Sequence, residues 1–460
     1  MERGHRPPRD ARLSALRAPR IALCVALAAA AALAGCGGGG GEPPGQKVAV
    51  RVDRAHVVTR SRMRVGITHT EFSLDVPASR AAIARGRAVA SRVAGVQNQH
   101  IYGWGASNPE PRPGVYDWRS LDRRVALMRS LPGTPVITLC CAPDWMTRLG
   151  RTGSTYPNLP PTAAHVADFA RLATAVARRY PSIRHFIVWN ELKGYYSRRL
   201  RNWDAAAYAQ LYNATYDALK AVNPAIRVGG PYIVLAGTGS GHAAAHTTWA
   251  TADPIIARDR RFLRRWLRLA HGVDFLAIDR SLVSPTHDPN RYPRSVLIGL
   301  THWFGDVVRE LSAMSPAPVW YAESYIHPES GGRFAQAAEA SMLAQELRGG
   351  AAVSLRWGPQ ATGPSSERRN AEALWSDPRR PGGGRPLPLA AIYALFRVTF
   401  PPGTPIVASR SSSPGVETLA STRTVLLINK LPRPVSVTLP GARVALPGYG
   451  VRVVPLGKGA

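Results

Sequence analysis

Residues 185–222, HFIVWNELKGYYSRRLRNWDAAAYAQLYNATYDALKAV, contain the pattern that decides the fold. The segment opens with a short apolar run that stops at Asn190 and Glu191, and after a polar loop it continues with helical periodicity. A strand that is apolar on both faces and is followed by an amphipathic helix is typical of a parallel sheet covered by helices. The segment therefore predicts a β-then-α unit whose buried strand ends in an amide beside a carboxylate.

The same unit recurs along the chain. A short β-branched run followed by a longer amphipathic segment occurs eight times between residues 63 and 400. The predicted strands are residues 63–70, 93–105, 134–145, 185–191, 226–234, 273–281, 317–324 and 351–360. Eight such units fit the α/β class and a closed (β/α)8 TIM barrel. An open doubly wound sheet is the alternative fold, but no glycine-rich phosphate-binding fingerprint follows the first strand.

Two segments flank the predicted barrel, which covers residues 63–400. Residues 401–460 consist of short alternating runs broken by proline and glycine, which predicts a small antiparallel, sandwich-like β domain. A domain of about 60 residues has little core of its own. The alternating run KVAVRVDRAHVV, in the Gly/Pro-rich tether at residues 36–62, can lend this domain a strand.

Residues 1–35 have the pattern of a bacterial secretory signal. Arginines precede the apolar run at residues 21–35, which is too short for a comfortable membrane span. The box LAGC resembles a lipoprotein signal, in which the cysteine after the small residues carries the lipid, and here that cysteine is Cys36. An ordinary signal peptide with a chance cysteine is the alternative. We expect an extracytoplasmic protein that is tethered to the cell membrane through Cys36.

The chain is strongly basic but has no nucleic-acid motif. Its formal net charge is +30, and only five of the 59 basic residues are lysines. The arginines are scattered without a recognition helix, ribonucleoprotein motif or zinc knuckle, so we predict no nucleic-acid partner. Solvated helix faces are the favoured explanation, and attraction to anionic envelope polymers or acidic sugars is the other. Cys140 and Cys141 lie in an apolar run and do not indicate a disulfide framework.

Two glutamates stand at the ends of predicted strands on roughly opposite sides of the barrel. Glu191 ends the fourth strand, and Glu323 ends the seventh. In such barrels the loops after the strands build the active site, and inward side chains can meet across a bore of about 15 Å. Two carboxylates about 5 Å apart cleave a glycosidic bond with retention: one attacks the anomeric carbon, and the other, kept protonated by its neighbour's charge, donates to the leaving oxygen. The pair therefore predicts a glycosidase that needs no metal and no cofactor.

These residues carry a resemblance to a known group of enzymes. The run YDWRSLDRRVALMRSLPGTPVITLCCAPDWM, the stretch HFIVWNELKG and the strand-seven glutamate resemble glycoside hydrolase clan A, and are closest to family 39, the β-xylosidase and α-iduronidase group. The resemblance spans about residues 63–400, and the small β domain is similar to the accessory domain of those enzymes. It implies that Glu191 is the general acid/base, that Asn190 binds the sugar 2-hydroxyl, and that Glu323 is the nucleophile. At a separation of about 5 Å from Glu191, we expect the Glu323 carboxylate to be ionised.

The chain departs from the clan pattern at two strands. Many members place a histidine or tyrosine near the end of strand six, where this chain has Asp279 and Arg280. The arginine expected on strand two is not evident, and NQHIYGWG supplies His100, Tyr102 and Trp104 there. These departures leave both glutamates in place, and they leave the identity of the sugar open.

Further substrate-binding candidates lie at or near strand ends. Trp145 and Trp357 are expected to stack on the apolar faces of a sugar ring, with a role as plain core aromatics as the alternative. His100 and Asp279 are candidates for the pocket wall, and Tyr325, just beyond the nucleophile, either closes the pocket or packs.

The sequence thus predicts a membrane-tethered, retaining, β-xylosidase-like glycoside hydrolase with a carbohydrate substrate. A surface lipoprotein that binds carbohydrate and has lost turnover is the leading alternative, and the survival of both carboxylates argues against it. A metal-dependent barrel hydrolase is the third possibility. The pair His242 and His246 has metal-ligand spacing, but it lacks the glutamate after the first histidine and an evident third ligand.

Overall fold

The structure is a computed structural model. The residues that it describes are 46–149, 159–235, 253–282, 293–326, 332–363 and 373–457. The chain divides into two compact units, Met1–Pro43 and Pro44–Ala460, and all described residues lie in the second. The predicted signal peptide and Cys36 lie outside the described residues, as do His242 and His246.

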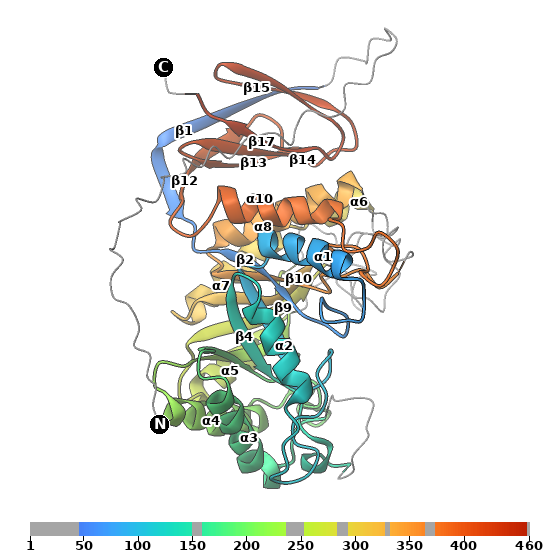
Figure 1. The fold of residues 1–460 in the computed structure, drawn as a ribbon. Helices are drawn as coiled ribbons and strands as arrows, with labels where there is room; N and C mark the ends of the chain where they lie inside the picture. Colours follow the sequence, from blue (N-terminus) through green and yellow to red (C-terminus); the bar gives the residue numbers. More distant parts are fainter. Residues whose placement is uncertain are drawn as a thin grey trace, which may run out of the picture. The chain divides into compact units, whose positions relative to one another are not determined.

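Eight parallel strands close into a barrel, which confirms the predicted fold (Figure 1). In ring order they are β2 (Arg64–Thr68), β3 (Val96–His100), β4 (Thr134–Leu139), β5 (His185–Val188), β8 (Arg227–Val234), β9 (Phe275–Ser281), β10 (Val319–Tyr325) and β11 (Val353–Trp357). The last strand closes the ring by pairing in parallel with the first. Because helices cover the outer face, these strands are buried on both sides, and most of them are apolar; β3, with the sequence VQNQH, is the polar exception.

The helices that connect the strands lie around the barrel (Figure 1). They are α1 (Arg80–Val93), α2 (Arg119–Arg129), α3 (Val166–Arg179), α4 (Ala205–Val222), α5 (Ala257–Leu269), α6 (Arg294–Gly299), α7 (His302–Met314), α8 (Arg333–Gly349) and α10 (Pro388–Thr399). Helix α3 shows the expected amphipathic spacing, since its buried side chains include Phe169, Leu172, Ala173 and Val176. The helical segment predicted after strand six is divided into α6 and α7.

The barrel interior has an apolar layer and a polar layer. The apolar layer includes Val136, Ile187, Phe275 and Trp320, which pack in one cluster. The polar layer is a chain of hydrogen bonds: Thr138 donates to Asn98 at 2.8 Å, Asn98 to Thr68 at 3.4 Å, and Thr68 to the carbonyl of Ala322 at 3.0 Å. These bonds connect strands β2, β3, β4 and β10. They fix the relative positions of strands whose ends carry the site described below.

A seven-stranded sheet follows the barrel. Its order is β16 (Ala442–Leu446), β15 (Val435–Leu439), β1 (Gln46–Arg60), β12 (Pro405–Ser411), β13 (Val416–Ser421), β14 (Thr424–Asn429) and β17 (Val451–Pro455). Strand β1, blue in Figure 1 among red strands, comes from the segment before the barrel. Strand β1 pairs antiparallel with β12 but parallel with β15, so the sheet is mixed, whereas the strands of residues 401–460 pair with one another antiparallel as predicted. No hairpin turn joins β1 to β15, so nothing in the local chain imposes an antiparallel pair.

Helix α8 fastens the barrel to this sheet through one buried carboxylate. Ser341 and Gln345 donate to the two oxygens of Glu417 on β13, at 2.5 and 2.6 Å. Arg348 lies 3.4 Å from the same carboxylate and also donates to the carbonyl of Thr418. Glu417 is thus held by three residues of a single helix.

Two further features of the described residues are the absence of a membrane-spanning helix and the presence of a disulfide. Within the described residues, no helix is long and apolar enough to cross a membrane. Cys140 and Cys141, just after β4, form a disulfide between neighbouring residues. This bridge was not expected, because adjacent cysteines in an apolar run have no spacing that distinguishes them from two packed thiols.

Candidate active site

Glu191 lies in a tight turn that follows strand β5. Trp189, Glu191 and Leu192 have positive φ angles of 71°, 51° and 52°, which residues other than glycine seldom adopt. The indole Nε1 of Trp189 holds the turn by donating to the carbonyl of Lys193 at 3.0 Å. Backbone in this conformation persists only where surrounding packing imposes it, and such positions cluster at functional sites. The buried strand ends in Asn190 and Glu191 because this turn directs both side chains toward other strand ends.

Glu323 owes its inward direction to an irregularity in strand β10. In a regular strand alternate residues face opposite sides, so Glu323 would face the helices, as does Tyr321, whose hydroxyl donates to the carbonyl of Phe304 at 2.6 Å. The register with β9 shifts between Tyr321 and Glu323. This bulge lets both Ala322 and Glu323 face the interior. Glu323 then stands in register with Asp279 of β9.

Three carboxylates converge at this end of the barrel. One oxygen each from Glu191, Asp279 and Glu323 can be chosen so that all three lie within 4.8 Å of one another. Tyr232 of β8 donates to Glu323 Oε2 at 3.4 Å, and Tyr325 makes a further hydrogen bond to Glu323. Asp279 is 4% exposed, and its Oδ1 has no hydrogen-bond partner among the described residues. The site therefore contains one carboxylate more than the predicted pair.

Glu323 and Asp279 both have raised pKa values. Burial and, second, the charge of Glu191 raise the pKa of Glu323 to about 8. Burial and then the charges of Glu323 and Glu191 raise the pKa of Asp279 well above its usual range. This raised pKa favours the protonated form of Glu323 in the free protein, and its ionised form in a substrate complex stays a prediction. The bulge buries Glu323 beside other carboxylates, and hydrogen bonds from Tyr325 and Tyr232 only partly offset that effect.

Lys193 supplies a positive charge at the mouth of the site. Its Nζ lies 2.9 Å from Glu191 Oε2 and 5.4 Å from the ring centroid of Trp104. The side chains of Lys193 and Glu191 are 32% and 23% exposed, so the ion pair stands where solvent or a ligand can reach it. The same charge opposes the raised pKa values of Glu323 and Asp279. Lys193 thus partly compensates the negative charge of the cluster.

An aromatic wall stands beside the carboxylates. The ring centroid of His100, at the end of β3, lies 4.6 Å from that of Trp104 and 6.0 Å from that of Trp357. Burial lowers the pKa of His100 to about 3, so the ring is neutral, and its Nε2 lies 3.3 Å from Asn190 Oδ1. The amide Nδ2 of Asn190 has no partner among the described residues. The wall therefore combines two half-buried tryptophan rings with a buried amide donor that has no partner among the described residues.

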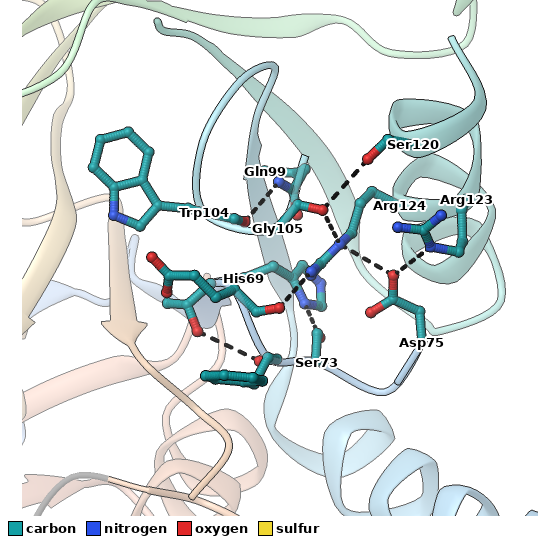
Figure 2. Close-up of polar contacts among 12 residues, drawn as sticks. His69, Ser73, Asp75, Gln99, Trp104, Gly105, Ser120, Arg123 and Arg124 are labelled. Atoms are coloured by element: carbon teal, nitrogen blue, oxygen red, sulfur yellow. Dashed lines mark hydrogen bonds and ion pairs between the residues drawn. The ribbon is translucent and has the colours of Figure 1, made fainter. Parts of the chain in front are cut away.

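A buried arginine supports the loop that carries Trp104 (Figure 2). Arg124 of α2 donates to the carbonyl of Gly105 at 3.2 Å, and its Nε lies 3.1 Å from a carboxylate oxygen of Asp75. It therefore joins the loop after β2 to the loop after β3. Gly105 has φ of 90°, and a Cβ there would overlap the Arg124 guanidinium. Gln99 adds a hydrogen bond to the Trp104 carbonyl at 3.3 Å.

Tyr325 and Trp145, the two remaining substrate-binding candidates, have different surroundings. Tyr325, at the end of β10, is 9% exposed and lies beside Glu323, with the Arg356 guanidinium 5.5 Å from its ring. Trp145 donates from its indole nitrogen to the carbonyl of Glu110 at 2.8 Å, and its ring meets His165 edge to face. These contacts join the loop after β3 to the region before α3. The substrate-stacking role of Trp145 stays a prediction.

Several residues of the site escaped sequence reasoning. Tyr232 and Lys193 contact the two glutamates, and neither was singled out. Tyr232 has a positive φ of 53° at a register shift of β8, which no local motif indicates. Lys193 stands two positions after Glu191, so its proximity was a signal that could have been used. Arg124 reaches the site from α2, and only the fold reveals that position.

The three carboxylates are also donors of the kind that hard cations accept. Lys193 already places a positive charge 2.9 Å from one of the three side chains, which weighs against a resident cation. We therefore assign no metal to this site.

Comparisons with known proteins agree with the barrel. No protein-family model and no curated protein matches this chain. A conserved exported protein from Bacteroides fragilis aligns with a TM-score of 0.59 at 12% identity, covering 89% of this chain and 100% of that one. A monomeric β-xylosidase from Caulobacter crescentus CB15 aligns with a TM-score of 0.53 at 17% identity, covering 83% and 76%. A glycoside hydrolase family 30 subfamily 8 xylanase from Clostridium acetobutylicum aligns with a TM-score of 0.53 at 14% identity, covering 88% and 98%.

What these proteins share with the chain is the fold. The chain is structurally similar to glycosidase barrels that include family 30. Sequence identities of 12% to 17% are too low to show that these proteins and the chain share an activity. They also do not show membership of family 39, which the sequence resembles.

Proposed function

We propose that this protein is a retaining glycoside hydrolase, with Glu323 as nucleophile and Glu191 as general acid/base. The observation that carries the proposal is the approach of their carboxylate oxygens to within 4.8 Å at the carboxyl end of the barrel strands. Retaining enzymes hold the two carboxyl groups about 5–5.5 Å apart, whereas inverting enzymes separate them by about 6.5–9.5 Å to admit water. The xylosidase and xylanase of similar fold make a β-linked xyloside the first substrate class to test.

The two residues perform two displacements at the same carbon. In the first, an oxygen of Glu323 forms a bond to the anomeric carbon while the glycosidic C–O bond breaks and Glu191 gives its proton to the leaving oxygen. In the second, Glu191 takes a proton from water, the water oxygen bonds to the anomeric carbon, and the Glu323 carboxylate leaves. Two inversions give a product of retained configuration.

This mechanism requires the proton and the charge to be distributed differently than in the free protein. Glu323, with its pKa raised to about 8, holds a proton at rest, and Glu191 faces Lys193 at 2.9 Å. In the proposal, a bound sugar separates Lys193 from Glu191, and the proton of Glu323 passes to Glu191, which leaves Glu323 ionised and Glu191 protonated. The positive charge that develops at the anomeric carbon then stabilises the ionised form of Glu323. Hydrogen bonds from Tyr325 and Tyr232 favour the same form.

The remaining groups of the site hold the sugar in the proposal. Asn190, whose Nδ2 is free among the described residues, donates to the 2-hydroxyl. Trp357 and Trp104 present rings for the apolar face of a pyranose. Asp279, whose buried Oδ1 has no hydrogen-bond partner among the described residues, binds a further hydroxyl that reaches it.

A second candidate is a protein that binds carbohydrate without turnover. The ion pair between Lys193 and Glu191, together with the protonated Glu323, is the observation that favours it, because each opposes its residue's proposed role. The two candidates predict the same ligand class and differ in catalysis alone.

Hydrolysis of a panel of aryl glycosides and xylo-oligosaccharides by the purified mature protein separates the candidates. We expect release of the aryl group from at least one β-glycoside, loss of that activity in Glu323→Gln, and no effect of a chelator. Binding of an oligosaccharide without hydrolysis of any substrate would contradict the enzyme and support the binding protein.

We further propose export and attachment to the cell membrane through a lipid on Cys36. The LAGC box supports this, and one protein of similar fold is described as exported. Cys36→Ala should move the protein from the detergent-extracted membrane fraction to a soluble or uncleaved form. A processed Cys36→Ala protein that stays with the membrane would refute the anchor.

A further inference from the structure

Helix α5 carries a row of arginines on its outer face. Its buried side is apolar, with Phe262, Leu263 and Trp266 packed into the core. The arginines recur with the spacing of one helix face and are all exposed: Arg261, Arg264, Arg265 and Arg268. From first to last they span about 10 Å of helix.

A second group of arginines stands on the hairpin beside this helix. The hairpin consists of β6 (Tyr196–Ser197) and β7 (Asn202–Trp203). It packs against α5, since Asn202 donates to the carbonyl of Arg258 at 3.3 Å and the Arg258 guanidinium lies 5.4 Å from the Trp203 ring centroid. Its turn adds three exposed arginines, Arg198, Arg199 and Arg201.

These seven arginines have no acidic partner among the ion pairs of the described residues, whereas their neighbours do. On the same helix, Arg258 pairs with Asp259, and Arg260 pairs with Asp253 and Glu310. The acidic groups near the face are therefore already engaged by other arginines. Guanidinium groups gathered without counter-charges create a positive potential that attracts anions.

The face is hollowed rather than flat. A groove of about 370 Å³ runs between hairpin and helix, lined by Leu200, Asn202 and Trp203 on one side and by the four helix arginines on the other. A second hollow of about 480 Å³ continues beyond Arg264 and Arg268 to Glu310 and Met314 of α7. The lining thus combines guanidinium groups with apolar surface.

We propose that this groove binds a linear polysaccharide that carries carboxylate groups. A guanidinium binds a carboxylate through two parallel hydrogen bonds, and the apolar side chains of the groove offer contact to the faces of sugar rings. The phosphates of a lipid surface or of a DNA duplex would meet the guanidinium groups but would leave the apolar side chains of the lining, such as Leu200 and Trp203, without a partner. The choice of a sugar polymer rests on the proposed carbohydrate function.

The position of the groove links it to the candidate active site. The β6–β7 hairpin belongs to the same connection between β5 and α4 that begins with Glu191 and Lys193. A polymer in the groove contacts Leu200, Asn202 and Trp203 of this connection, and therefore lies along the loop that carries the proposed acid/base. The groove acts as a holding site that keeps an acidic polymer beside the barrel mouth.

The test measures the affinity of the full mature protein for oligogalacturonate, with xylo-oligosaccharide of similar length as the neutral probe. The variant replaces Arg261, Arg264, Arg265 and Arg268 by glutamine, which preserves helix propensity. The matched control replaces four exposed arginines of the seven-stranded sheet by glutamine: Arg51, Arg410, Arg443 and Arg452. Both variants remove the same net charge.

We expect oligogalacturonate to bind in a salt-dependent way, with the groove variant weakened about tenfold or more and the control changed less than about twofold. Equal weakening in both variants would show that net charge alone attracts the polymer and would overturn the site. Absence of binding would overturn it as well. Tighter groove-dependent binding of anionic vesicles or single-stranded DNA would overturn the choice of partner.

Glu323→Gln separates this proposal from the proposed function. The groove does not include Glu323, so this variant should bind oligogalacturonate as the wild type does while it loses turnover. If wild-type protein shows no hydrolysis but groove-dependent binding persists, the holding site stands and the enzyme assignment falls.

Discussion

Two buried glutamates of this barrel, Glu323 and Glu346, have pKa values raised to about 8 and yet stand in different surroundings. Burial is the largest cause in both cases. Glu346 lies on α8 against the outer side of the barrel, where it faces the hydroxyls of Ser324 and Ser354. Glu323 faces the interior at the open end of the strands, within 4.8 Å of oxygens of two other carboxylates.

The difference shows that a perturbed pKa does not by itself mark an active site. Behind the strands, the carboxylate oxygens of Glu346 are enclosed without a hydrogen-bond partner among the described residues, and the charged neighbours are paired within the protein: Arg356 pairs with Glu339 at 3.0 Å, and Tyr393 donates to Glu339 at 2.8 Å. Such a network holds a helix on a barrel. In front of the strands, the carboxylates converge beside partly exposed tryptophan rings. The proposed catalytic role of Glu323 rests on this convergence beside an accessible wall, not on its pKa.

The largest effect on turnover should appear when Glu323 and Glu346 are each replaced by glutamine. Glu323→Gln should lower kcat by at least about 10⁴-fold, because the nucleophile is lost. Glu346→Gln, an equally neutral replacement of an acid with the same raised pKa, should stay within about threefold of wild type. Initial rates on an activated aryl glycoside measure both. A comparable loss of kcat in a folded Glu346→Gln protein would contradict the claim that Glu323 takes part in turnover and Glu346 does not.

The next effect concerns the proposed acid at the mouth. Glu191→Ala should lower turnover by about 10²–10⁴-fold on a poor leaving group and much less on a dinitrophenyl glycoside, which needs no proton. Rates plotted against leaving-group pKa should therefore be steep for the variant and shallow for the wild type. Equal losses on all leaving groups would remove Glu191 from the acid role.

A moderate effect should separate the two tryptophans expected to stack on sugar. Trp357→Ala should reduce kcat/KM about tenfold with little change in Tm, because the ring is part of the accessible wall. Trp145→Ala should lower Tm more, because it loses the hydrogen bond to the Glu110 carbonyl that joins two loops. Thermal unfolding and kinetics of both variants measure this. If the loss of stability in Trp357→Ala fully explained its loss of activity, Trp357 would be a structural core residue and not a stacking platform for sugar.

The smallest effect is one that both glutamates should share. In each case the folded protein keeps a proton up to about pH 8 that the unfolded chain releases near pH 4.5, so stability should fall as pH rises through this window. Glu323→Gln and Glu346→Gln should each flatten that fall, by roughly 1–3 kcal/mol between pH 5 and 8. Denaturant unfolding at several pH values measures it. If Glu323→Gln left the pH dependence of stability unchanged, Glu323 would not have the raised pKa.

The sequence pattern of the strands predicted the barrel, but it did not predict the pKa values of the carboxylates at the site. Apolar runs ending in Asn190–Glu191 and at Glu323 were enough to find the barrel and the two acids, because periodicity and strand order depend on local sequence. The bulge that turns Glu323 inward has no local signature. The resting proton on Glu323 also depends on which other carboxylates the fold brings near it, and Asp279 comes from a different strand.

The central claim is the division of roles between Glu191 and Glu323, and azide rescue tests it most directly. Azide is a small anion that can occupy the space left by a removed carboxylate and attack the anomeric carbon. With an activated aryl glycoside, Glu191→Ala plus azide should yield a glycosyl azide of retained configuration, because the Glu323 intermediate still forms. Glu323→Gly plus azide should yield the inverted product, and proton NMR of the anomeric signal distinguishes the two. The reversed pattern would exchange the roles, and rescue of neither variant would contradict the account.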